Sequence, residues 1–240
     1  MSYGLIFFAL LAGVIFPLYA FATARKTQAY MHANPDKLIQ TYKSILVMQW
    51  GMCLPVVIML SLKAGGLSSI GLHFFTDPLS IAGLVATVIL GAQLVKRLPY
   101  PEKRLIKGKK KLKEVMFVLP KNKAEHQWSL GVSVTAGVCE EILFRGLFYE
   151  LLLEHTTAIF AILIVNIMFG LGHAGTKFKN MLSTMGLGLL WSAIYYFTGS
   201  LWVPIAMHIL VDVYSLTLGL KVYQYDQQIV NQVEKTADAG

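Results

Sequence analysis

Three groups of ionisable residues interrupt stretches of sequence that are otherwise apolar. Charged side chains inside a hydrocarbon environment are costly, so such groups indicate a functional site. Carboxylates and imidazoles together are the side chains that transfer protons in general acid–base catalysis. The pattern therefore predicts proton-transfer chemistry in an apolar setting. The groups are Glu140, Glu141 and Arg145; His173; and His208 and Asp212.

The spacing within the first group separates its two glutamates. Glu141 and Arg145 are four residues apart, so on a helix they share one face and can form an ion pair. Glu140 points about 100° away around the same helix, which leaves its carboxylate outside that pair. We therefore expect Glu140 to be a general base, and Glu141 with Arg145 to support the site structurally.

His208 and Asp212 are also four residues apart. We expect Asp212 to accept a hydrogen bond from the imidazole of His208 and so to fix its tautomer. Each group also has a purely structural interpretation: His208–Asp212 as a buried pair, and His173 as a helix-end residue near lipid headgroups. Six such side chains on three apolar segments would be costly as structure alone, which favours a site.

The composition identifies the setting as a membrane. Hydrophobic residues make up 55% of the 240 residues and charged residues 14%, whereas a soluble domain carries roughly 25% charged residues. A run of about 18 or more apolar residues predicts a helix that crosses the bilayer. We therefore predict an all-α fold, a polytopic bundle of membrane helices.

Seven apolar stretches are long enough to be spans. The fourth is long and carries the first ionisable group. Short joints between the fourth and fifth spans, and between the sixth and seventh, predict antiparallel neighbours. The predicted spans are Gly4–Ala24, Ser44–Leu62, Leu79–Val95, Trp128–Leu153, Thr157–His173, Met181–Phe197 and Leu201–Leu220.

The basic residues predict the orientation of these spans. Eleven of them lie between Lys96 and Lys123, and Lys63 is the only one in the loops assigned to the outside. By the positive-inside rule, the N-terminus lies outside and the C-terminus inside. We divide the chain into three helices plus a basic cytoplasmic loop (1–127), a catalytic helical core (128–220) and a polar cytoplasmic tail (221–240).

The net charge of +8 indicates anionic membrane lipids as partners and no nucleic acid, because the basic residues flank apolar segments. Cys53 and Cys139 both fall inside apolar segments, so no disulfide framework is predicted. The compact length and short loops favour the cell membrane of a prokaryote. The chain is thus expected to be a multi-pass integral protein of that membrane.

Three sequence elements carry a resemblance to a known family. They are Glu140-Glu141-x-x-x-Arg145, Phe169-x-x-x-His173 and His208-x-x-x-Asp212. In these residues the chain resembles the CAAX prenyl endopeptidases and bacteriocin-processing membrane proteases, also called the CPBP or Abi family. The resemblance runs from about Trp128 to Leu220, and the first three spans match only as generic membrane helices.

The resemblance implies an intramembrane endopeptidase of the glutamate type that needs no cofactor. Glu140 with His173 would activate a water, and His208 with residue 212 would steady the oxyanion of the tetrahedral intermediate. A zinc site built from the same residues is the alternative. The substrate would be a peptide or protein, with or without a lipid modification.

One position departs from the pattern of the prenyl-protein processors. Those carry Asn where this chain has Asp212, and an ionised Asp cannot donate a hydrogen bond to an oxyanion. Asp212 would then orient His208, which would be the donor. This departure weakens the inference of a prenylated substrate and leaves maturation of, or immunity to, bacterial peptides open.

Two other classes of protein remain open. A non-catalytic immunity or peptide-binding factor could use the same cavity, and a transporter could use the same groups as a proton relay. A transporter would be favoured by inverted repeats, and the sequence has none that we detect. Convergence of Glu140, His173 and His208 on one water-sized point would favour the enzyme.

Overall fold

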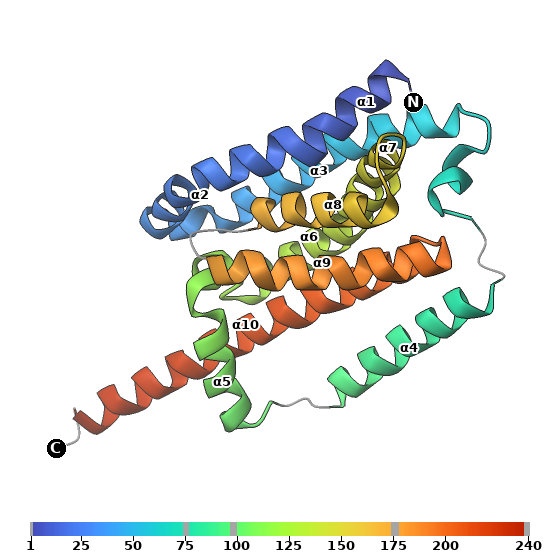
Figure 1. Cartoon of the computed structure of the whole chain (residues 1–240). Coiled ribbons are helices and arrows are strands. Elements are labelled where there is room, and N and C mark those ends of the chain that lie inside the picture. The colour runs from blue at the N-terminus through green and yellow to red at the C-terminus, as the bar shows by residue number, and fades with distance from the viewer. Residues whose placement is uncertain (1, 74–76, 97–99, 174–177, 238–240) are drawn as a thin grey trace.

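The structure is a computed structural model that describes residues 2–73, 77–96, 100–173 and 178–237. Within these ranges the chain consists of helices and short connections, and no strand occurs (Figure 1). The predicted all-α membrane fold is confirmed. The helices are α1 Tyr3–Leu10, η1 Leu11–Ile15, α2 Phe16–Ala33, η2 Pro35–Lys37, α3 Leu38–Ser61, η3 Gly66–Ile70, α4 Pro78–Val95, α5 Glu102–Leu112, η4 Lys113–Val118, α6 Lys123–Glu141, η5 Ile142–Phe148, α7 Tyr149–Leu153, α8 Ala158–Gly172, α9 Phe178–Thr198 and α10 Trp202–Ala237.

Four helical stretches of the described chain are long and apolar enough to cross a membrane, and they correspond to the first, second, third and seventh predicted spans. The fifth predicted span is the shorter apolar helix α8, the fourth is α6 to α7, and the sixth is α9. The number of spans and their orientation stay predictions. The four stretches are Tyr3–Ala33, Pro35–Ser61, Pro78–Val95 and Trp202–Lys235.

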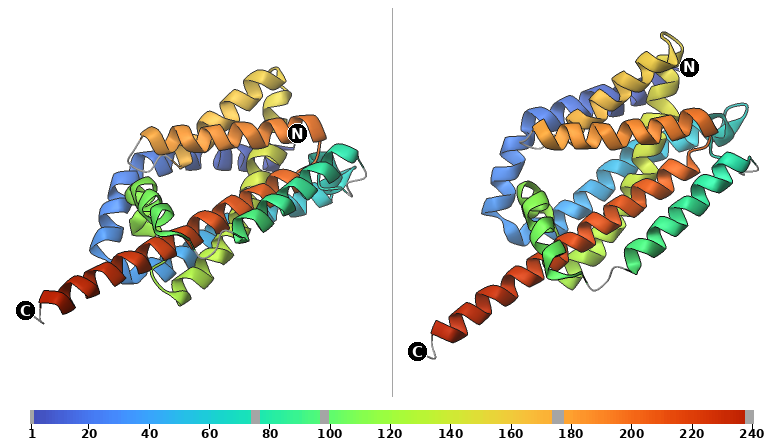
Figure 2. Two further views of the ribbon diagram at one scale, coloured as in Figure 1. Left: turned by 90° about the horizontal axis from the view of Figure 1, so that it is seen from below. Right: turned by 60° about the horizontal axis from the view of Figure 1, so that its bottom comes forward.

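Several segments outside the predicted spans are helical, and two of them are long. The basic segment 96–123 contains the helix α5, which packs against α10. Helix α10 continues to Ala237, well past the predicted end of its span at Leu220, because no Gly or Pro follows Gly219 within it to stop the helix. Its last turns extend beyond the rest of the molecule (Figure 2).

Helix α6 lies at the centre of the packing. It contacts α3 on one side and α10 on the other, while α8 packs against both α9 and α2. Helix α4 lies alongside α10 at the edge of the bundle (Figure 2). Because α6 is enclosed on both sides, the polar groups at its C-terminal end can be reached from several helices at once.

Two π-helical segments interrupt long helices beside this centre. Segment η1 lies between α1 and α2, and η5 follows α6 directly after Glu141. The two segments pack against each other, since Gly13 of η1 leaves room for the ring of Phe148 of η5, where any Cβ would clash. Wider turns of this kind often occur at functional sites because they re-aim side chains.

The close approach of α6 to α10 depends on Gly137. A Cβ at this position would lie 2.5 Å from Cγ1 and 3.1 Å from the backbone nitrogen of Ile209. We expect Gly137→Ala to lower the free energy of unfolding by about 1–3 kcal/mol, since backbone has to move. Gly131→Ala is the matched control on the same helix, because nothing lies within 4 Å of its Cβ. That change is expected to stabilise by up to about 1 kcal/mol. Unfolding in mild detergent measures the stability of both variants. Equal changes in the two variants would contradict the close approach of α6 to α10 at Gly137.

Candidate active site

All six predicted site residues lie together near the C-terminal end of α6. Glu140 and Glu141 end that helix and Arg145 follows on η5. His173 is the capping residue at the end of α8, and His208 and Asp212 lie one turn apart on α10. Three segments that are far apart in the sequence, α6 with η5, the end of α8, and α10, therefore contribute to one cluster.

The carboxylate of Glu140 lies between two imidazoles and an amide. Its Oε1 accepts a hydrogen bond of 2.7 Å from Nε2 of Gln49 on α3. Its Oε2 lies 3.5 Å from Nε2 of His173 and 3.9 Å from Nε2 of His208. Oε2 is buried and has no hydrogen-bond partner among the residues that the structure describes. The two imidazoles thus face the same buried, unsatisfied oxygen, while the amide holds the other oxygen of the carboxylate.

The other ring nitrogen of each histidine is held by an acceptor. Nδ1 of His173 lies 2.8 Å from the backbone carbonyl of Phe169, which can only accept, so Nδ1 carries the hydrogen. Nδ1 of His208 lies 2.7 Å from Oε1 of Glu141, a carboxylate oxygen that also accepts from Arg145. Both rings consequently present Nε2 toward Glu140, and Nε2 is the atom left to take or give a proton.

In place of the expected hydrogen bond to Asp212, His208 donates one to Glu141. Oδ2 of Asp212 lies 3.7 Å from Nε2 of His208, which is beyond hydrogen-bond distance, while Glu141 binds Nδ1. The reason is the packing of α10 against α6, which turns the Nδ1 edge of the ring toward Glu141. Asp212 remains at the edge of the cluster with its side chain 35% exposed.

Arg145 pairs with Glu141 as expected and also joins three helices. Its Nη1 lies 3.1 Å from Oε1 of Glu141, and the arginine side chain is 1% exposed. Nη2 donates to Oδ1 of Asn166 on α8 at 3.0 Å and to the carbonyl of Gly188 on α9 at 3.1 Å. Nε donates to Oγ of Ser192 on α9 at 3.4 Å. Glu141 is thus shared between a structural arginine and the histidine of the site.

Aromatic rings pack against both histidines. Trp191 of α9 stacks on His208 with ring centroids 4.4 Å apart and an interplanar angle of 15°. The ring of Phe169 lies 4.6 Å from that of His173, and the guanidinium of Arg145 lies 4.5 Å from the Phe169 centroid. These rings pack around His208, which is 3% exposed, whereas the side chain of His173 is 39% exposed.

Sequence reasoning missed several of these partners. Asn166 and Ser192 are polar residues within apolar helices, a signal that could have been used. Gln49 is likewise a polar residue in the second predicted span, 6% exposed in the structure. Trp191 gave no usable signal, because aromatic residues are common in membrane helices.

A mainly apolar cavity of about 180 Å³ leads to Glu140 and His173 from between α2, α3 and η5. It is open to the outside of the bundle and is large enough for a single large side chain. Its lining residues are Ala12, Phe16, Pro17, Ile45, Met48, Gln49, Met52, Glu140, Leu143, Phe144, Gly172 and His173.

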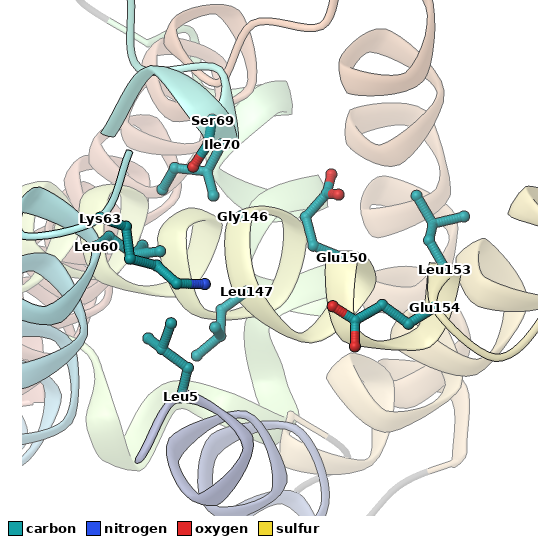
Figure 3. Close-up of a pocket in the computed structure, with 10 residues that line it drawn as sticks. All are labelled: Leu5, Leu60, Lys63, Ser69, Ile70, Gly146, Leu147, Glu150, Leu153 and Glu154. Atoms are coloured by element: carbon teal, nitrogen blue, oxygen red, sulfur yellow. The ribbon is translucent and has the colours of Figure 1, made fainter. Parts of the chain in front are cut away.

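A second cavity of about 310 Å³ lies elsewhere, between η3, α7 and the ends of α1 and α3. Figure 3 shows Lys63 on one side of it and the carboxylates of Glu150 and Glu154 on the other. None of the six predicted site residues lines it. Of these two cavities, the first is therefore the one that reaches the ionisable cluster around Glu140.

Within the described ranges, no group of three or more His, Cys, Asp and Glu side chains is arranged to hold a metal ion. Cys53 and Cys139 are both buried, and their thiols contact each other.

Comparison with known proteins covers the part of the chain that forms this cluster. A family model described as "Type II CAAX prenyl endopeptidase Rce1-like" matches residues 123–214. A protein of Bacillus subtilis (strain 168) named "Putative membrane peptidase YdiL" is 31% identical over 103 residues, which are 42% of this chain and 41% of that relative. The match thus spans about two fifths of this curated relative. No solved structure matches the chain.

Proposed function

We propose that this chain, whose residues 123–214 belong to the type II CAAX prenyl endopeptidase (Rce1-like) family, is a membrane-embedded endopeptidase. The observation that carries the proposal is the buried Oε2 of Glu140, which faces Nε2 of both histidines and has no partner within the described part of the chain. A buried carboxylate oxygen without a donor requires one, and a water molecule supplies it.

The proposed reaction begins with that water. Oε2 of Glu140 takes one of its protons while the water oxygen bonds to the carbonyl carbon of the substrate, and His173 holds the base in place. The carbonyl electrons move to the oxygen, where protonated Nε2 of His208 donates a hydrogen bond to the oxyanion. The intermediate then collapses, the C–N bond breaks, and Glu140 returns its proton to the leaving nitrogen.

Glu141 supports the last of these roles. Its hydrogen bond to Nδ1 of His208 favours the protonated ring, so that Nε2–H can serve as a donor. Asp212, which lies on the Nε2 side of the same ring, adds a second negative charge near the imidazolium. The catalytic residues of the proposal are Glu140, His173 and His208, with Glu141, Arg145 and Asp212 as support.

The substrate of the proposed enzyme is a peptide or protein segment that reaches the site through the apolar cavity. Eight of the residues lining it have apolar side chains, so an apolar stretch of substrate fits it. The basic residues of α5 and its neighbours place anionic lipids at the cytoplasmic face in the proposed orientation, N-terminus out and C-terminus in.

Hydrolysis is proposed to proceed without a metal. The purified protein is expected to retain its cleavage rate in the presence of a zinc chelator and to contain far less than one zinc per chain by elemental analysis, because Glu140 itself activates the water. A stoichiometric zinc content together with loss of activity on chelation, restored by added zinc, would overturn the metal-free mechanism in favour of a zinc site.

The function is tested by comparing protein termini in membranes. Cells that make the wild-type chain and cells that make Glu140→Gln are compared by terminal proteomics. We expect new termini within or next to membrane segments that occur with the wild-type chain alone. Identical sets of termini in both samples, with both proteins present at equal levels, would refute the peptidase.

A further inference from the structure

Gln49 is a hydrogen-bond partner of Glu140 that comes from outside the family-matched region. It lies on α3, and Nε2 of its amide donates to Oε1 of Glu140 at 2.7 Å. The residue is 6% exposed and lines the apolar cavity. Its position is secured by contacts one residue and one turn further along, where Nε1 of Trp50 donates to Oγ1 of Thr135 at 3.2 Å and Cys53 contacts Cys139.

The other oxygen of each of these two side chains needs a hydrogen-bond donor. Oε1 of Gln49 and Oε2 of Glu140 are both buried oxygens that lack a hydrogen-bond partner within the described ranges. Two acceptors cannot satisfy each other, because neither carries a hydrogen. A single water has two hydrogens, so one water that donates to both oxygens would satisfy the pair and direct its lone pairs away from them.

We propose that Gln49 is a positioning residue of the active site, whose amide fixes Glu140 through Oε1 and whose carbonyl oxygen holds the attacking water beside Oε2. This inference rests on the proposed function and extends it to a helix that the family match does not reach. The amide keeps Oε1 occupied, so the basic lone pairs of Oε2 are the ones that face His173 and the water.

The proposal predicts how the pH dependence of the reaction changes. A hydrogen bond to the ionised carboxylate favours ionisation, and its loss makes Glu140 bind a proton more readily. Gln49→Met removes the donor at similar size and should move the acid limb of kcat/KM to higher pH by about one unit. Gln49→Glu places a second carboxylate there and should move the limb further.

Gln40→Met is the matched control, because Gln40 is an exposed glutamine on the same helix. Its acid limb should coincide with that of the wild type. Acid limbs of the two Gln49 variants that also coincide with the wild type would overturn the proposal. If Gln49→Met does not fold, Gln49→Glu still tests the proposal, since it preserves the shape and polarity of the side chain.

A second measurement needs no activity. The infrared absorption of the protonated Glu140 carboxyl group, assigned by its loss in Glu140→Gln, is followed against pH in membranes. The band should persist to higher pH in Gln49→Met and to still higher pH in Gln49→Glu. An unchanged titration contradicts the role of Gln49 whether or not a substrate is known, whereas a shifted titration without any cleavage contradicts the proposed function alone.

Discussion

Replacing Glu140 by glutamine is expected to reduce peptide cleavage by about 100-fold or more while leaving the fold intact. Glutamine keeps the shape of the side chain, and its carbonyl oxygen can still accept the hydrogen bond from Gln49. What it loses is the basic oxygen that faces both histidines. The measurement is kcat/KM for a cleaved peptide in lipid vesicles, normalised to folded protein.

The control is Glu150→Gln. Glu150 is also a partly buried glutamate on the same helical stretch, but it lines the other cavity and accepts a hydrogen bond from Tyr195 (Figure 3). Glu150→Gln should leave kcat/KM within about threefold of the wild type, because Glu150 takes no part in the proposed reaction. Undiminished cleavage by Glu140→Gln would mean that another group is the base. Peptide binding without cleavage by the wild type itself would favour the non-catalytic binding factor.

The residues of the cluster could be predicted because their cost in a membrane makes them conspicuous. Glu140, His173 and His208 are ionisable groups in apolar segments of the sequence, and in the structure the two imidazoles face one oxygen of Glu140. The i,i+4 spacing also predicted the contact between Glu141 and Arg145, because that pair lies on one helix. Local geometry suffices for contacts of this kind.

Contacts between different helices could not be predicted from the sequence in the same way. His208 and Asp212 have the spacing of a pair, yet the shorter contact of His208 is with Glu141, 67 positions earlier in the chain. Which edge of the imidazole faces which carboxylate depends on the rotation of α10 against α6. The two helices approach closely where Gly137 packs against Ile209, and spacing along one helix carries no information about such a contact.

The same limit applies to the fold. Apolar stretches located the helices, since a buried or lipid-exposed backbone has to satisfy its own hydrogen bonds. The π-helical turns of η1 and η5 left no such signal, because they arise where two helices accommodate each other, as Gly13 and Phe148 do. The end of α10 was misjudged for the opposite reason: a polar helix packed by few neighbours resembles a loop in composition.

Replacing Glu141 by glutamine is expected to lower the free energy of unfolding by about 3–5 kcal/mol, because it leaves the buried charge of Arg145 without its counter-charge. Arg145 is 1% exposed and its remaining partners, Asn166, Ser192 and the carbonyl of Gly188, are all neutral. Asp226→Asn is the matched control at the exposed ion pair with Lys109, where a loss of at most about 1 kcal/mol is expected. Unfolding of each variant in mixed detergent measures these differences.

The double variant Glu141→Gln with Arg145→Gln separates the two functions of Glu141. Removing the arginine removes the orphaned charge, so part of the lost stability should return. Cleavage should not return with it, because Nδ1 of His208 then faces a neutral amide and the protonated ring that donates to the oxyanion is no longer favoured. Activity per folded molecule should therefore stay low in the single and the double variant alike. Recovery of activity in step with stability would show that Glu141 acts through Arg145 alone, and that its short contact with His208 has no part in the reaction.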